Sequence, residues 1–244
     1  MRFGVISDIH GNLPAFEAVC EAMPPVDRLL CAGDVVGYNP WPAACVDRVR
    51  ELGAVTVRGN HDRAVAFDGG RGFNAMARAG VRHAREELGA AEMEWLRSLP
   101  TEQFVADGRI HMVHGHPDDP DRYTYPREFS ASMLQDDVEV VIVGHTHVQG
   151  ARRVDGGVVL NPGSVGQPRD GDPRAAYAVV ELGADDEGGG ADDKGSDADD
   201  VNDVGSGAPT VETHRVEYDI DRVIEAVAEA GLPERIGTRL KAGQ

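Results

Sequence analysis

Short apolar runs that end in polar residues recur along the first 150 residues, and this pattern constrains the fold more than any other feature. Strand-like runs are expected at 2–6, 28–32, 54–57, 109–114 and 138–144. Between them lie helical patterns at 13–22, 41–52, 73–88, 91–98 and 129–135. Such alternation predicts an α/β domain with a largely parallel sheet.

The alternation of strand-like and helical segments stops after residue 150. Four strand-like runs follow with no long helix between them, at 150–154, 157–161, 175–182 and 210–218. We therefore expect an antiparallel or mixed second sheet, and a two-sheet β-sandwich flanked by helices. Two further helices are expected at 221–230 and 233–242, and the 244 residues fit a single domain spanning 1–244.

One segment, 184–207, lies outside this pattern because it is rich in Gly, Asp and Ser and almost free of apolar side chains. It cannot bury enough apolar surface to offset the entropy of ordering it. We expect a disordered, acidic loop inserted in a C-terminal β-hairpin. An acidic metal-binding loop is the alternative, although the residue order of a calcium-binding loop is missing.

The charge balance is strongly acidic. Forty-two acidic residues oppose 24 basic ones, giving a net charge of −18, and only Lys194 and Lys241 are lysines. Such a surface disfavours binding to nucleic-acid polymers or anionic membranes. Scarce lysine with retained arginine favours a salt-adapted, halophilic source.

The expected location is cytoplasmic. The chain shows no signal-peptide pattern and no apolar run of membrane-spanning length. Its three cysteines have no paired spacing, which is typical of reduced thiols.

Each of five polar motifs directly follows a strand-like run. The motifs are SDIHGN (7–12), AGDVVGYN (32–39), RGNHDR (58–63), MVHGHP (112–117) and VGHTH (143–147). In an open α/β sheet, ligands gather beyond the carboxyl ends of the strands, so all five motifs are expected at one crevice. Residues two apart at a strand end point the same way, which pairs Asp8 with His10 and His145 with His147.

These motifs contain seven candidate metal ligands of mixed type: Asp8, His10, Asp34, Asn60, His114, His145 and His147. Imidazole combined with carboxylate and amide oxygen suits Mn, Fe, Co, Ni or Zn rather than Ca or Mg. Seven ligands are too many for one tetrahedral ion, but they fill two sites if one carboxylate bridges them. Two such ions can polarise a phosphoryl group and stabilise the entering and leaving oxygens.

The ordered series D-x-H, G-D, G-N-H-D, H and G-H-x-H resembles the calcineurin-like metallophosphoesterase superfamily over residues 1–170. The segment LNPGSVGQPRDGDPRAAYAVVEL (160–182) resembles the small bacterial and archaeal phosphodiesterase-like members, which are related to diadenosine-tetraphosphate hydrolases. The resemblance implies the four-layer αββα metallophosphoesterase fold.

The resemblance also implies roles. One metal would be held by Asp8, His10 and His147, and the second by Asn60, His114 and His145, with Asp34 bridging. The cofactor would be two divalent ions, with manganese favoured. His61 would lie beside the scissile phosphate, where it would donate a proton or stabilise charge. Asp62 would fix the tautomer of His61 and raise its pKa.

The implied reaction is attack of a metal-bound hydroxide on a phosphoester. The protein serine/threonine phosphatases of the superfamily carry G-D-x-x-D-R-G and G-N-H-E, but this chain has GDVVGYN and GNHD. The missing arginine favours a phosphodiesterase acting on nucleotides or small phosphodiesters. Tyr38, Asn39 and Arg169 are candidate substrate contacts.

Several alternatives stay open. Phosphomonoesterase activity and dinucleoside-polyphosphate hydrolysis are close to the favoured reaction. A non-catalytic scaffold on the same fold is a rival of another class, although retention of His61 and all seven ligands weighs against it. A nuclease is a further rival, which the acidic surface disfavours. The oligomeric state is open, with a homodimer among the alternatives.

Overall fold

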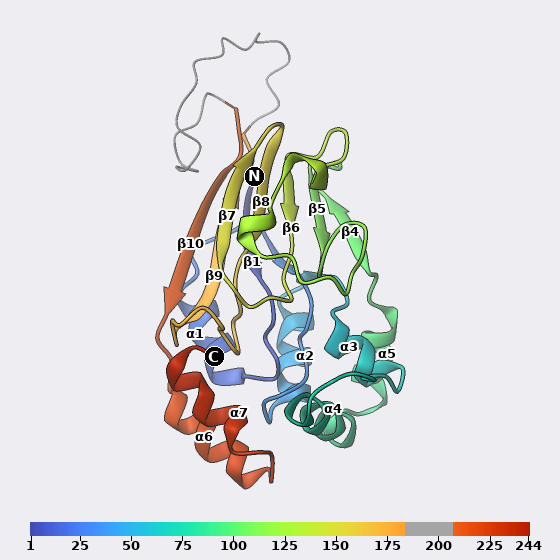
Figure 1. The fold of residues 1–244 in the computed structure, drawn as a ribbon, viewed down its shortest axis with the longest axis vertical. Coiled ribbons are helices and arrows are strands. Elements are labelled where there is room, and N and C mark those ends of the chain that lie inside the picture. The colour runs from blue at the N-terminus through green and yellow to red at the C-terminus, as the bar shows by residue number, and fades with distance from the viewer. Residues whose placement is uncertain (184–206) are drawn as a thin grey trace.

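A computed structural model describes residues 1–183 and 207–244 and shows two stacked five-stranded sheets (Figure 1). Sheet A has the strand order β10-β9-β1-β2-β3. Its strands are β1 (Arg2–Ile6), β2 (Arg28–Cys31), β3 (Val55–Thr56), β9 (Ala175–Glu181) and β10 (Thr210–Val216). Sheet B has the order β4-β5-β6-β8-β7. Its strands are β4 (Glu102–Val105), β5 (Ile110–Val113), β6 (Val140–Ile142), β7 (Gly150–Val154) and β8 (Gly157–Asn161).

Both sheets are mixed. In sheet A the parallel strands β1, β2 and β3 are extended by the antiparallel strands β9 and β10. In sheet B the parallel strands β5, β6 and β8 are flanked by the antiparallel strands β4 and β7. The sandwich prediction is confirmed, but the expectation of a separate sheet from the C-terminal strands is wrong. An apolar strand pattern does not specify its partner: β8 pairs with β6, whereas β9 pairs with β1.

Helices flank the sandwich. They are α1 (Leu13–Ala22), α2 (Pro42–Glu51), α3 (Asn60–Ala66), α4 (Ala75–Glu87), α5 (Ala90–Ser98), α6 (Ile220–Glu229) and α7 (Arg235–Thr238). Three short 3₁₀ turns are η1 (Pro126–Glu128), η2 (Ala131–Met133) and η3 (Arg239–Ala242). Two elements, α3 and β4, were not predicted; they are only seven and four residues long. Both are too short for a periodic pattern to stand out.

The main core lies between the sheets. Phe3, Val5 and Leu30 of sheet A are fully buried in one cluster with Ile142 and Leu160 of sheet B. The other face of sheet A packs against a second cluster formed by α1 to α5. The outer face of sheet B is covered by the segment that carries η1 and η2. Burial on both faces explains why the parallel strands are continuously apolar.

The segments that follow the parallel strands of the two sheets lie next to one another. The parallel strands β1, β2 and β3 end just before the first three polar motifs. Strand β5 ends within the fourth motif, directly before His114, and β6 ends just before the fifth. A backbone hydrogen bond from Gly144 to His114 (2.8 Å) joins the two motifs of sheet B. The His145 N–H donates to Asp8 Oδ2 (3.1 Å) and so links sheet B to sheet A.

No helix within residues 1–183 and 207–244 is long and apolar enough to cross a membrane. The acidic segment joins β9 and β10, which pair antiparallel. The prediction that residues 184–207 form a disordered loop falls almost entirely outside the described residues.

Candidate metal centre

The structure brings the predicted ligands into two adjoining buried groups. Three sets of side chains have their ligand atoms within 4.8 Å of one another: Asp8–His10–His147, His10–Asp34–His61 and Asp34–His114–His145. All of these side chains are at most 5% exposed. Because His10 and Asp34 each belong to two sets, the three sets form one continuous cluster.

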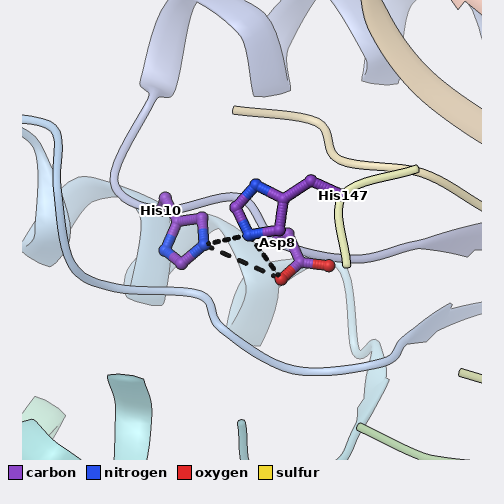
Figure 2. A group of neighbouring side chains, drawn as sticks. All are labelled: Asp8, His10 and His147. Carbon is purple, nitrogen blue, oxygen red and sulfur yellow. Dashed lines mark hydrogen bonds and ion pairs between the residues drawn. The ribbon is translucent and has the colours of Figure 1, made fainter. Parts of the chain in front are cut away.

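The first group contains Asp8, His10 and His147 (Figure 2). His147 Nε2 lies 3.2 Å from Asp8 Oδ1 and 3.0 Å from His10 Nε2. His10 Nε2 lies 3.7 Å from the same Asp8 oxygen. Donor atoms that share a divalent ion about 2.1 Å away lie about 3.0–3.4 Å apart. Two of the three spacings lie in this range and the third, 3.7 Å between His10 Nε2 and Asp8 Oδ1, is slightly longer, so the group is close to the arrangement that one divalent ion needs.

The second group contains Asn60, His114 and His145. His114 Nε2 lies 3.2 Å from Asn60 Oδ1, and the His114 and His145 rings are 4.9 Å apart. His145 Nε2 lies 3.2 Å from the carbonyl oxygen of Asp121, which leaves Nδ1 of that ring without a hydrogen bond to any described residue. One amide oxygen and two imidazoles make a donor set that suits a borderline divalent metal.

Asp34 lies between the two groups. Its Oδ2 is 3.6 Å from His10 Nε2 of the first group and 3.4 Å from His114 Nε2 of the second. Its Oδ1 accepts a hydrogen bond from the His61 backbone N–H (2.8 Å). One oxygen is therefore held by the protein while the other is directed at both groups.

Backbone carbonyls orient three of the imidazoles. The Nδ1 atoms of His10, His114 and His147 lie 3.2, 2.7 and 2.6 Å from the carbonyl oxygens of Val36, Ala32 and Gln167, respectively. If each Nδ1–H donates to its carbonyl, the Nε2 lone pair of each ring points into the cluster. Such outer contacts fix the tautomer and orientation of metal-binding histidines.

Asp8 is oriented in a similar way. Its Oδ2 accepts hydrogen bonds from Ser7 Oγ (2.7 Å) and from the His145 N–H. Its Oδ1 is buried and has no hydrogen-bond partner among the described residues. A buried carboxylate oxygen without a donor is costly, so a cation at this position would satisfy it.

The protonation states also suit cation binding. Burial lowers the pKa of His10, His145 and His147, so these rings are neutral near pH 7. Burial opposes the charged form of His114 as well, but the adjacent Asp34 carboxylate raises its pKa to about 10. Burial favours a protonated Asp8, but His147 beside it holds its pKa well below the usual value. Metal binding would displace the His114 proton, because only neutral imidazole is a ligand.

The backbone at the centre is strained. Six of its residues have a positive φ of 49–67°: Asp8, His10, Asp34, Tyr38, His145 and His147. Non-glycine residues adopt this left-handed region rarely, and such strain clusters at functional sites. This conformation could not be predicted from the sequence, because nothing in these residue types requires it.

Two glycines allow close backbone approach. A Cβ on Gly59 would lie 2.0 Å from Asp34 Oδ1, and one on Gly144 would lie 2.1 Å from Ser7 Oγ. A side chain at Gly59 would therefore displace Asp34, and one at Gly144 would displace the Ser7 hydroxyl that orients Asp8.

His61 lies beside the cluster, but Asp62 does not act on its ring. The His61 ring centroid is 4.8 Å from that of His10, and its buried Nδ1 has no hydrogen-bond partner among the described residues. Asp62 instead accepts hydrogen bonds from the backbone N–H groups of Asp34, Val36 and Gly59 (2.8–3.1 Å). The expected Asp62–His61 contact is therefore wrong. Burial lowers the pKa of His61 to about 4, against the expected rise.

The three candidate substrate contacts differ in position. Tyr38 lies next to the cluster, with ring centroids 4.8 Å from His10 and 4.7 Å from His61. Arg169 Nη2 lies 3.3 Å from the Tyr38 hydroxyl. Asn39 is 1% exposed and its amide donates to the His10 carbonyl oxygen (3.0 Å), which indicates a role in holding the loop.

Sequence reasoning missed three contributors. Ser7 directly precedes Asp8, so its adjacency was the available signal. Gln167 acts through a backbone carbonyl, which no side-chain motif can reveal. Tyr123 is 50% exposed and its ring centroid lies 3.9 Å from that of His145, but it falls in an irregular loop without periodicity.

Comparison with known proteins identifies the family. The family described as "Calcineurin-like phosphoesterase superfamily domain" matches residues 1–185. An uncharacterised protein of Methanocaldococcus jannaschii is 29% identical and covers 98% of this chain and 97% of its own length. Phosphodiesterase YfcE of Escherichia coli is 27% identical over 74% of this chain and 88% of its own.

Solved structures agree. A metallophosphoesterase from Sphaerobacter thermophilus shares 36% identity and a TM-score of 0.77, with both chains fully covered. A hypothetical protein from Pyrococcus horikoshii OT3 has 22% identity and a TM-score of 0.78, covering 100% of this chain and 98% of its own, which shows the shared fold. With this fold and these buried His/Asp clusters, the chain is a phosphoesterase-family hydrolase and belongs to the calcineurin-like phosphoesterase superfamily.

Proposed function

We propose that this protein hydrolyses phosphodiesters of nucleotides or other small molecules at a pair of divalent metal ions. The observation that carries the proposal is the placement of Asp34 Oδ2 within 3.6 Å of imidazoles from both ligand groups. A carboxylate oxygen in this position can bridge two ions. Phosphoester hydrolysis commonly uses two ions in such an arrangement.

The donor set fits these ions. Asp8, His10 and His147 would hold one, and Asn60, His114 and His145 the other, with Asp34 shared. Manganese is the favoured metal among those that accept mixed nitrogen and oxygen ligands. When bound, the ions would supply Lewis acidity to the phosphoryl group and lower the pKa of water.

The surrounding side chains would bind and orient the phosphate. His61 is neutral near pH 7 because burial lowers its pKa, so an N–H donor to the phosphate oxygens suits it better than proton donation. Asp62 acts as a positioning residue, since it holds the backbone of Asp34 and Gly59. Arg169 and the Tyr38 hydroxyl, adjacent to one another, would contact the substrate beyond the ions.

The substrate class rests on two observations. A 27% identical relative is named a phosphodiesterase, and the exposed Tyr123 ring offers an aromatic face that a nucleobase could stack on. The strong net negative charge weighs against a nucleic-acid polymer. Phosphomonoesterase activity and dinucleoside-polyphosphate hydrolysis remain the alternatives.

The proposal also covers the domain organisation, the cellular location and the oligomeric state. We treat residues 1–244 as one domain, because both sheets share a core. The three free cysteines and the acidic composition support a reducing, salt-rich cytoplasm. A homodimer is the oligomer to test first.

The test is a substrate panel on manganese-reconstituted protein. We expect turnover of bis(p-nitrophenyl) phosphate to exceed that of p-nitrophenyl phosphate and of diadenosine tetraphosphate. Asp34→Asn should lose both ions by elemental analysis, because an amide cannot bridge two cations, and should lose at least about 100-fold in activity. Full metal content without turnover of any ester would revive the scaffold alternative.

The role of His61 has its own test. His61→Ala should retain both ions yet lose about 10²–10³-fold in kcat, because the missing donor acts on the transition state. His83→Ala is a matched control, since His83 contacts the Pro40 carbonyl oxygen rather than the cluster. Wild-type kcat in His61→Ala would remove this residue from the proposed mechanism.

A further inference from the structure

The ring of His145 is held by the opposite nitrogen from the other three imidazoles of the centre. In His10, His114 and His147, Nδ1 lies next to a backbone carbonyl oxygen and Nε2 faces the cluster. In His145 it is Nε2 that lies next to a carbonyl oxygen, that of Asp121 (3.2 Å). A neutral His145 can offer Nδ1 to an ion only if Nε2 carries the proton, and the Asp121 carbonyl favours this form by accepting its hydrogen bond. The position of this carbonyl therefore sets the tautomer of His145.

The Asp121 carbonyl belongs to a less buried part of the protein than the carbonyls that orient the other three rings. Those three come from fully buried residues: Ala32, Val36 and Gln167. Asp121 lies in the irregular segment 114–125 between β5 and η1, and its side chain is 52% exposed. This segment folds back on itself, since the N–H groups of His116 and Asp119 each donate to the other's carbonyl oxygen (3.0 Å). Its placement beside His145 therefore depends on contacts with the rest of the molecule.

Arg63 provides such a contact. Its Nη2 donates to both carboxylate oxygens of Asp121 (2.7 and 2.8 Å). Arg63 lies three residues after Asn60 in α3, so the two residues share one face of that helix. Asn60 Oδ1 is 3.2 Å from His114 Nε2. One short helix thus carries a proposed ligand of the second ion and also the anchor of the segment that orients another ligand.

Asp121 is held at three points. Its carboxylate accepts from Arg63, its N–H donates to Asp119 Oδ1 (3.0 Å), and its carbonyl oxygen faces His145. Tyr123, two residues later, places its ring centroid 3.9 Å from that of His145. Both members of the ion pair are exposed, and exposed ion pairs usually add little to the stability of a whole protein. The effect of this pair should therefore be local, on the order of residues 119–123 beside His145.

We propose that Arg63 is a positioning residue for the second ion, the one assigned to Asn60, His114 and His145. Through Asp121 it places the carbonyl oxygen that holds the His145 ring with Nδ1 free for the ion. The inference rests on the proposed function for the role of His145 as a metal ligand. Without Arg63, the segment around Asp121 would move away from His145, and the ring would adopt both tautomers. The first ion should be little affected, because the contacts that orient its ligands come from other segments.

Metal titration tests this role on the full chain. Metal-free protein would be titrated with manganese by isothermal titration calorimetry, and His145→Ala would identify the binding event that belongs to the second group. Arg63→Gln should weaken binding of the second ion about fivefold and leave the first unchanged. The effect is smaller than the roughly 10–100-fold cost of losing an outer contact outright, because the Asp121 carbonyl itself remains.

Further variants assign the effect to the ion pair. Asp121→Asn should weaken the second ion as much as Arg63→Gln does, and the double variant should weaken it no more than either. Arg63→Lys should recover part of the affinity, because the positive charge remains. Arg50→Gln is the matched control. Arg50 pairs with Asp47 on α2, and these side chains are 42% and 53% exposed, against 43% and 52% for Arg63 and Asp121. This control should bind both ions as the wild-type protein does.

The tautomer of His145 is a second measurement, and it requires neither metal nor turnover. Long-range proton–nitrogen NMR of the metal-free protein reports which ring nitrogen carries the proton, and comparison with His145→Ala identifies the signal. We expect the Nε2–H tautomer in the wild-type protein and in Arg50→Gln. In Arg63→Gln we expect a mixture of both tautomers.

The outcomes separate this inference from the proposed function. An unchanged tautomer in Arg63→Gln overturns the positioning role even in an active enzyme. So does an unchanged affinity for the second ion, equal weakening of both ions, or the same loss in Arg50→Gln. A tautomer that depends on Arg63, in a protein that binds one ion or none, supports the positioning role and refutes the two-ion centre instead.

Discussion

Asp8 shows how one residue is prepared for a cation. Its two carboxylate oxygens have different surroundings, since Oδ2 accepts two hydrogen bonds whereas Oδ1 accepts none from the described residues. The protein thus fixes the carboxylate plane and leaves a single oxygen directed at His147. Orientation of this kind lowers the entropy cost of binding, because the ligand does not have to be ordered by the metal.

Ser7→Ala should therefore weaken metal binding without removing any proposed ligand. The substitution deletes the hydroxyl that donates to Asp8 Oδ2, and losses of outer contacts of this type cost about 10–100-fold in metal affinity. Titration of the metal-free protein with manganese, followed by calorimetry, would measure the change.

Ser98→Ala serves as the control, because the Ser98 hydroxyl donates to the Trp95 carbonyl oxygen on the protein surface. The control should bind manganese as the wild-type protein does. An unchanged affinity in Ser7→Ala would show that the His145 N–H alone is sufficient to orient Asp8.

Residue types at the centre were predictable, but their conformations were not. The order of the five motifs was enough to identify Asp8, Asp34 and His145 as candidate ligands. The left-handed backbone at these positions depends on the tertiary contacts around them, so no local propensity encodes it. Asp62 was assigned to His61 because the two are adjacent in sequence, whereas its carboxylate accepts hydrogen bonds from three backbone N–H groups in two loops.

At the scale of elements, the C-terminal helices pack against Tyr38, which borders the candidate metal centre. Val223 and Val227 of α6, Ile236 of α7 and Leu240 of η3 form one buried cluster with Tyr38. Tyr38 in turn contacts His10 and His61. Loosening these helices should therefore alter both folding and substrate contacts.

Ile236→Ala should destabilise the protein by about 2–5 kcal/mol, the usual cost of truncating a fully buried aliphatic side chain. The same variant should raise KM more than it lowers kcat, since the metal ligands lie on other elements. Urea denaturation and steady-state kinetics would measure the two effects.

Ile220→Ala is a suitable comparison, because Ile220 lies in α6 but is only partly buried against the same cluster. It should cost less than Ile236→Ala. If Ile236→Ala were as stable as the wild-type protein, the packing of these helices against Tyr38 would not contribute to folding.

Element types followed from periodicity, whereas strand partners did not. The bounds expected for the first helix match α1, which has Asn12 as its N-cap. The β7–β8 and β9–β10 pairs were also visible as successive strands, but their distribution over two sheets depends on long-range pairing. A short apolar strand such as β6 could satisfy its hydrogen bonds with several neighbours, and only the assembled core selects among them.

At the scale of the whole molecule, charge is unevenly distributed along the chain. Residues 184–206 contain nine acidic residues and one lysine, so replacing them with a short turn changes the net charge from −18 to −10. The flanking strands remain paired from Thr210 with Glu181 onward. A Cβ on Gly183 would lie 2.5 Å from the Gly207 carbonyl oxygen, so the two ends are close enough to be joined directly. We therefore expect such a deletion variant to fold.

Salt should stabilise the full chain more than the deletion variant, because like charges repel within the compact state and ions screen that repulsion. Between about 0.1 M and 2 M KCl, the melting temperature of the full chain should rise on the order of 5 °C, equivalent to about 1–2 kcal/mol. The deletion variant should show a smaller rise. A third protein, with the nine acids of residues 184–206 changed to Asn or Gln, separates charge from chain length and should behave like the deletion. If the melting temperatures of all three proteins rose equally with salt, the charges of residues 184–206 would not lower the stability of the fold. The salt response would then arise from the rest of the surface.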